Sequence, residues 1–215
     1  MLDLVIVGAS GFAREVYQWA RPAFDPGQYR IKGFLSNRPD DLKGWRIEPP
    51  LLGDDESYGI EPGDRFLFAI GRPEIKRAMI ERLQARGARF ATLIHPTAVV
   101  APTAEIGEGV IVCPFCTVSD HVRLGDFAML NFYSSVGHDA RIGRYAILSP
   151  YATVNGFSVV GEEAFLGSHV TVTAGRKLGD GARVSANVAV HSDVPPRTLV
   201  YGPPAKQATI FAPGE

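Results

Sequence analysis

A six-residue period runs through the chain from residue 94 onward. Seventeen successive units follow one another without a gap, as in LNFYSS, VGHDAR, IGRYAI and LSPYAT. The first residue of every unit is Ile, Val or Leu, and the fifth is small or Val in every unit except the one that contains Arg176. An internal repeat of this length decides the fold before any local motif is considered.

This period excludes both common kinds of regular structure. A helix requires a period near 3.6 and an alternating strand requires a period of 2. Six residues instead suit one side of a coil with three flat sides, in which stacked coils bury their aliphatic residues in a continuous core. Glycine recurs at the second position, where a tight corner would leave no room for a Cβ atom. The sequence therefore predicts a parallel β-helix over the domain 91–215.

The first ninety residues follow another pattern. LDLVIVGASGF reads as a buried strand, a glycine-rich turn and the start of a helix near Phe12. YRIKGFLS and DRFLFAIG read as two further strands, and RPEIKRAMIERLQARG reads as a helix that ends at Gly87. Strands that alternate with helices predict a small Rossmann-like parallel sheet over the domain 1–90.

The glycine turn admits two interpretations. A glycine-rich turn at a helix N-terminus is a good phosphate cradle. The turn is G-x-S-G rather than G-x-G-x-x-G, and Ser36 follows the second strand where a dinucleotide site needs an acid. The alternatives are a site for the diphosphate of a nucleotide-linked substrate, or a turn that only packs helix on strand.

Composition removes several classes of function. The net charge of −1 gives no basic field for nucleic acid or anionic lipid, and no apolar run approaches a membrane span. The N-terminus lacks the features of a signal peptide, so we expect a cytoplasmic protein. Cys113 and Cys116 form a single C-x-x-C without a second pair, and ordinary positions in the repeat explain both. We expect no metal cofactor.

The order of the motifs resembles one subgroup of hexapeptide-repeat acyltransferases, which have a left-handed β-helix. The markers are VGASGFAREV, GFLSN, FAIGRPEIKR, LIHPTAVV, LNFYSSVGHDARIG and the terminal YGPPAK. The subgroup comprises bacterial UDP-4-amino-sugar N-acetyltransferases, GDP-perosamine N-acetyltransferases and sialic acid O-acetyltransferase-like proteins. The resemblance implies a homotrimer that transfers acetyl from acetyl-CoA to a nucleotide-linked amino sugar.

The resemblance also implies roles for individual residues. His138 is the expected general base, Asp139 its orienting partner, and Asn131 an acceptor-site residue. The implied nucleotide site comprises Gly8, Ser10, Gly11, Phe12, Ser36 and Gly71. The implied acetyl-CoA contacts are Ile147, Gly156, Ser168 and Ala186. A base of this kind suits the chemistry, because the attacking amine must lose a proton and an imidazole with a carboxylate on its other nitrogen can take it.

Two departures concern the acceptor. Many members of the subgroup have His where this chain has Phe12, and an Asp pair where it has Ser36-Asn37. The same base would serve a hydroxyl, so a sugar O-acetyltransferase of the sialic acid type remains an alternative. A non-catalytic β-helix assembly module is a third interpretation. A zinc hydratase is disfavoured, since no H-x-x-x-x-H pair is present.

Overall fold

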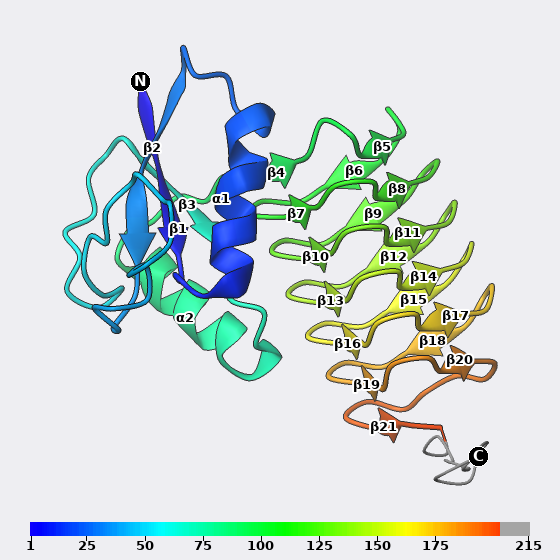
Figure 1. The fold of residues 1–215 in the computed structure, drawn as a ribbon. Helices are drawn as coiled ribbons and strands as arrows, with labels where there is room; N and C mark the ends of the chain where they lie inside the picture. The colour runs from blue at the N-terminus through cyan, green and yellow to red at the C-terminus, as the bar shows by residue number, and fades with distance from the viewer. Residues whose placement is uncertain (203–215) are drawn as a thin grey trace, which may run out of the picture.

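The computed structural model describes residues 1–202, apart from the side chain of residue 74. A small parallel sheet with two helices is followed by a β-helix that extends away from it (Figure 1). The predicted fold class is confirmed. Residues 203–215, which include most of the YGPPAK motif and the end of the predicted domain 91–215, lie outside the described residues.

The N-terminal sheet has three parallel strands in the order β2-β1-β3. These are β1 (Leu2–Val7), β2 (Tyr29–Leu35) and β3 (Asp64–Phe68), with α1 (Gly11–Ala23) after β1 and α2 (Pro73–Ala85) after β3. Alternate residues of β1 serve opposite faces of the sheet: Leu4 and Ile6 join the cluster of α1, whereas Val5 and Val7 join the cluster of α2. Both helices lie close to their predicted ranges, and Gly87 follows α2 with φ of +87°.

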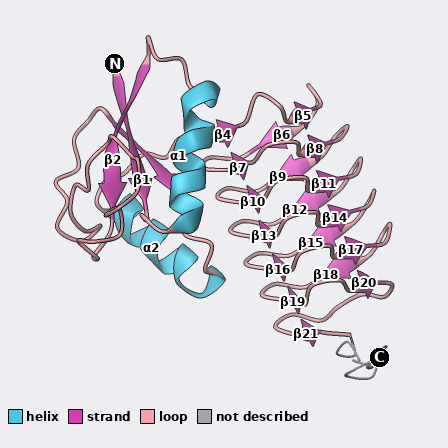
Figure 2. Cartoon of the chain, viewed as in Figure 1, coloured by secondary structure: helices cyan, strands magenta, loops and turns pink. Residues whose placement is uncertain are grey.

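The β-helix has three faces of short parallel strands, seen edge-on as a stack of coils (Figure 2). The first face comprises β4 (Leu93–Ile94), β7 (Ile111–Val112), β10 (Met129–Leu130), β13 (Ile147–Leu148), β16 (Phe165–Leu166), β19 (Arg183–Val184) and β21 (Leu199–Val200). The second face comprises β5 (Val99–Val100), β8 (Thr117–Val118), β11 (Ser135–Val136), β14 (Thr153–Val154), β17 (Thr171–Val172) and β20 (Ala189–Val190). The third face comprises β6 (Glu105–Ile106), β9 (Arg123–Leu124), β12 (Arg141–Ile142), β15 (Val159–Val160) and β18 (Lys177–Leu178).

Each coil has three corners, which we number by the faces that they join. The first corner joins the first face to the second, the second corner joins the second face to the third, and the third corner leads back to the first face. The glycines at second positions lie at these corners against the next coil, as predicted. A Cβ on Gly137 would lie 2.6 Å from the backbone nitrogen of Gly156, and no side chain can occupy that space.

The fourth residue of most units has a left-handed backbone, which the sequence did not predict. Tyr133 has φ of 59°, Asp139 60° and Phe157 61°. Residues other than glycine rarely adopt this region. The corner requires it, because the chain must turn sharply within two residues while its strands stay in register with the coils above and below.

The N-terminal domain sits against the first face of the β-helix. Ile111, Met129 and Ile147 occupy outward positions on this face but are only 2–3% exposed, and they share a cluster with Val16 and Ala20 of α1. On the other side, the guanidinium of Arg77 in α2 pairs with Glu163 at 2.8 Å. The apolar residues at the outward positions of the first face therefore form the surface against which α1 packs.

Candidate active site

His138 and Asp139 lie together on the second corner, directly after β11. The His138 side chain is 58% exposed and that of Asp139 43%. His138 Nδ1 is 2.9 Å from Asp139 Oδ2. With the carboxylate on Nδ1, the imidazole presents Nε2 for proton transfer. The predicted histidine–carboxylate pair is therefore present, and it faces solvent rather than the core.

The coil above the pair leaves room for the imidazole only because it carries glycine. A Cβ added to Gly156 would lie 2.8 Å from both Cε1 and Nε2 of His138. Phe157 meets the same imidazole edge-to-face, with ring centroids 5.0 Å apart. Gly156 and Phe157 thus fix the position of the ring from one side, while Asp139 holds it from the other.

Asn131 lies on the first corner of the same coil, at the other end of the second face. Its Oδ1 accepts a hydrogen bond from the Phe132 N–H at 2.8 Å. No hydrogen bond donated by its Nδ2 is found in residues 1–202. Because β11 separates the two corners, Asn131 and His138 do not meet within one chain.

The four residues expected to contact acetyl-CoA are similarly divided. Gly156 lies beside His138 on the second corner. Ser168 and Ala186 occupy the third positions of consecutive coils on the first corner, and both have exposed surface. Ile147 is 3% exposed and belongs to the surface against which α1 packs. Its burial argues against a direct contact between that side chain and a ligand.

An aromatic ladder, which the sequence analysis missed, lines the first corner. It consists of Phe115, Tyr133, Tyr151 and His169, whose rings stack in sequence with centroids 4.9, 5.0 and 4.7 Å apart. The first three side chains are 43–51% exposed. The signal was an aromatic or His residue at four successive positions spaced eighteen residues apart.

The residues of the predicted nucleotide site gather at the carboxyl ends of β1 and β3. Gly8 directly follows β1 and has φ of +105°, and a Cβ there would lie 2.9 Å from Ile70, which follows β3. Ser10 and Gly11 are exposed at the start of α1, and the Ser10 side chain does not cap the helix. The chain leaves β1 and β3 toward opposite faces of the sheet, which is the kind of switch point where α/β proteins bind ligands. Gly71 is exposed at the same edge.

Two other members of this site have specific contacts. Phe12 packs edge-to-face on Trp19 within α1, with centroids 6.0 Å apart. The Ser36 hydroxyl donates to Asp41 Oδ2 at 2.6 Å. An acid therefore does stand at the end of β2, although it comes from Asp41, five residues farther along the chain than Ser36. The residues directly after the strand, Ser36 and Asn37, gave no indication of Asp41.

One group of carboxylates in residues 1–202 could be mistaken for a metal site. Asp3, Glu61 and Asp64 gather at the amino ends of β1 and β3. Lys32 Nζ lies 2.8 Å from Glu61 and 3.0 Å from Asp64, and Arg30 pairs with Asp3 at 2.9 Å. Each of the three acids is paired with one of these two cations, so the group is an ion-pair network. Within residues 1–202, no helix has the length and apolar character needed to cross a bilayer.

Comparison with known proteins agrees with this geometry. Residues 3–83 match the model of the PglD N-terminal domain. A curated UDP-N-acetylbacillosamine N-acetyltransferase of Bacillus subtilis is 30% identical over 115 residues, which are 52% of this chain; the match spans about half the length of that relative.

Solved structures match over nearly the whole chain. The acetyltransferase domain of PglB from Neisseria gonorrhoeae is 27% identical with a TM-score of 0.85, over 97% of this chain and all of that one. PerB from Caulobacter crescentus, solved with CoA and GDP-perosamine, is 30% identical with a TM-score of 0.84, over 95% of this chain and 96% of that one. The chain belongs to the hexapeptide-repeat sugar N-acetyltransferase family.

Proposed function

We propose that this protein transfers the acetyl group of acetyl-CoA to the amine of a nucleotide-linked amino sugar, of the UDP- or GDP-4-amino-4,6-dideoxy type. The observation that carries the proposal is the solvent-facing His138–Asp139 pair at 2.9 Å. It lies in a chain that resembles PerB, a protein solved with CoA and GDP-perosamine, over 95% of its length. No metal takes part in the proposed reaction, which runs in the cytoplasm.

His138 acts as the general base in this reaction. The sugar amine attacks the thioester carbonyl carbon directly, and Nε2 of His138 takes the proton that the amine loses. The carbon–sulfur bond then breaks and the sulfur leaves as the thiol of CoA, with the proton returned to it. Asp139 holds the imidazole in the required tautomer and stabilises its protonated form.

The oxyanion formed on the thioester needs a hydrogen-bond donor. The backbone N–H of Gly156 suits this role, since it lies one coil above His138 and has no hydrogen-bond acceptor among the residues that the structure describes. Because this donor belongs to the backbone, its role depends only on Gly156 lying close to the imidazole of His138.

The acceptor nucleotide binds at the carboxyl ends of β1 and β3. The exposed first turn of α1 around Ser10 and Gly11 offers backbone N–H groups to a diphosphate. Asp41, held by Ser36, is an acceptor for ribose hydroxyls at the neighbouring strand end. Gly8, Phe12 and Gly71 border this edge.

A homotrimer would complete the site. The outward residues of the second face carry no charge; they are Val99, Thr117, Ser135, Thr153, Thr171 and Ala189. If three second faces meet around a threefold axis, the first corner of one subunit lies beside the second corner of the next. Asn131, Ser168, Ala186 and the aromatic ladder would then face His138 of a neighbouring subunit. Light scattering should give three times the 23.2 kDa mass of the chain, and a monomeric active enzyme would contradict this arrangement.

Replacement of Gly156 by Ala tests the packing of the base. The new Cβ would displace the imidazole, and misplacement of a catalytic group by about 1 Å can cost on the order of 100-fold in rate. The fold should tolerate the change, because the next coil has Ala174 at the same corner position. We expect kcat to fall about 10- to 100-fold with little change in melting temperature. Gly59→Ala, where a Cβ meets nothing within 4 Å, is the control, and equal rates for both variants would contradict the assignment.

The acceptor is tested with a panel of UDP-, GDP- and dTDP-linked sugars. Each nucleotide is presented with an amino sugar and with the corresponding hydroxyl sugar, and the mass of the product is measured. Acetylation of amino sugars alone supports the proposal. Acetylation of hydroxyl sugars alone would assign the chain to the sialic acid O-acetyltransferase type. If no sugar is acetylated and CoA does not bind, the assembly-module interpretation replaces the enzyme.

A further inference from the structure

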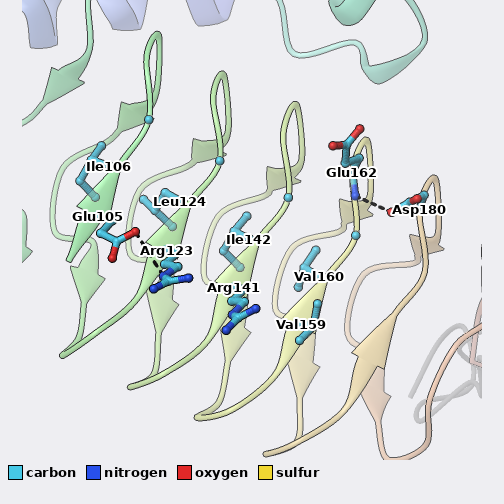
Figure 3. Close-up of a pocket in the computed structure, with 14 residues that line it drawn as sticks. Glu105, Ile106, Arg123, Leu124, Arg141, Ile142, Val159, Val160, Glu162 and Asp180 are labelled. Atoms are coloured by element: carbon cyan, nitrogen blue, oxygen red, sulfur yellow. Dashed lines mark hydrogen bonds and ion pairs between the residues drawn. The ribbon is translucent and has the colours of Figure 1, made fainter.

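Two arginines stand side by side on the outside of the third face. Arg123 in β9 and Arg141 in β12 are direct partners in the parallel register, so their side chains leave the same side of the sheet on consecutive coils. Figure 3 shows both side chains directed away from the β-helix in the same direction. Neighbouring strands lie about 4.8 Å apart, so an anion between the two guanidinium groups would relieve the repulsion between them.

Both arginines line two adjoining hollows of the surface. One groove of about 550 Å³ follows the third face and its glycine corners, from Glu105 to Asp180. The second hollow, of about 500 Å³, is lined by His121, Arg123, Asp139, Arg141 and Phe157. Asp139 and Phe157 are the two residues that hold the His138 ring. A ligand in the second hollow would therefore lie directly beside the proposed base.

One of the two arginines has no ion-pair partner in residues 1–202. Arg123 pairs with Glu105 at 3.2 Å, and both side chains are more than half exposed. Arg141 makes no ion pair or side-chain hydrogen bond within residues 1–202. The acid nearest to it along the chain, Asp139, is engaged by His138. The guanidinium of Arg141 thus has its full set of donors available.

We propose that Arg141, with Arg123 beside it, binds a phosphate group of a substrate in the hollow next to Asp139. The inference rests on the proposed function, in which both substrates carry phosphate: acetyl-CoA has a diphosphate and a 3′-phosphate, and the nucleotide-linked sugar has a diphosphate. The planar fork of an arginine suits bidentate binding of phosphate oxygens. Two such forks on consecutive coils form a site for phosphate rather than for a neutral group.

The test is Arg141→Gln, which removes the charge and shortens the side chain but keeps a polar group that can donate hydrogen bonds. With each substrate varied in turn, we expect KM for one of them to rise about tenfold, as for loss of a charged hydrogen bond, while kcat stays within about twofold. Arg141→Lys should recover part of the loss. Arg89→Gln is the matched control, because Arg89 is an exposed arginine of the other domain and has no ion pair in the described chain.

Two further comparisons of KM identify which substrate supplies the phosphate. If the site holds a phosphate of CoA, acetyl-pantetheine, which lacks the nucleotide, has the same KM with the variant as with the wild type. If the site holds the diphosphate of the acceptor, in place of the first turn of α1, KM for the sugar nucleotide rises and KM for acetyl-CoA does not. Unchanged KM values for both substrates in Arg141→Gln would overturn the proposal.

Calorimetry separates this proposal from the proposed function. Binding of CoA, UDP and GDP is measured with the wild type and with Arg141→Gln, and no turnover is required. If the wild type shows no acetyl transfer but Arg141→Gln binds one of these ligands about tenfold more weakly, the phosphate site stands and the reaction does not. If the variant binds all three as tightly as the wild type does, the phosphate site is wrong whatever the rate of turnover.

Discussion

Replacement of His138 by Ala should lower kcat by about 10²–10⁴-fold, the usual contribution of a general base. The fold should survive, because the side chain is 58% exposed and its hydrogen bond goes to the adjacent Asp139. Binding of acetyl-CoA should change little, since the imidazole acts on the proton of the acceptor amine. The measurement is steady-state release of free thiol, with CoA affinity determined in parallel by calorimetry.

The control for this variant is His191→Ala. His191 is exposed on the second corner two coils beyond Gly156, near the far end of the β-helix, so its loss removes an imidazole without changing the contacts of His138. A rate within about threefold of the wild type is expected for the control. The same small effect in His138→Ala would remove His138 from the mechanism, and another base would have to be sought.

Replacement of Lys76 by Met should stabilise the N-terminal domain by about 2–4 kcal/mol at pH 7. Lys76 lies in the first turn of α2 and is 2% exposed. Its ammonium has no hydrogen bond or ion pair within the described part of the chain. Burial lowers the pKa of Lys76 from 10.5 to about 7, since desolvation disfavours the charged form.

The sign of the pH dependence follows from this shift. The unfolded chain binds the Lys76 proton more tightly than the folded chain does, so protonation favours unfolding. This contribution makes the wild type more stable as pH rises from about 7 toward 10.5, and the dependence disappears in Lys76→Met. Met fills nearly the same volume, so the cost in packing should stay below about 1.5 kcal/mol.

Urea unfolding at pH 7 and pH 9 measures this effect. Both tryptophans, Trp19 and Trp45, lie in the first ninety residues, so their fluorescence reports on the N-terminal domain alone. Lys43→Met is the control, because the Lys43 side chain is 80% exposed, and its stability should match that of the wild type. A Lys76→Met protein no more stable than the wild type at pH 7 would show that the ammonium is satisfied in the native protein.

Much of the fold could be predicted because the repeat carries its own physical explanation. A branched aliphatic residue every six positions and glycine at the corners leave few alternatives to stacked coils. The pair at His138 and Asp139 was predictable for the same reason, since the repeat assigned both residues to a corner rather than to the core.

The features that were not predicted depend on contacts between coils or between domains. Nothing local to Tyr133 indicates a left-handed backbone, which arises from the register of the coils. The surface against which α1 packs left a signal in the sequence, because Ile111, Met129 and Ile147 are apolar at the sixth position, which is polar in most units of the other two faces. Lys76 also left one, since it lies four residues before the buried Ile80, on the same side of a predicted helix.

The central claim is that this chain moves acetyl from CoA to a sugar amine. The most direct measurement is thiol release from acetyl-CoA by the wild-type protein with a nucleotide-linked 4-amino sugar, compared with the same sugar already acetylated on that nitrogen. The account predicts turnover with the free amine, a product 42 Da heavier (the mass of an added acetyl group), and no turnover with the blocked sugar. Equal thiol release from both sugars would mean that the amine is not the acceptor, and it would contradict the account.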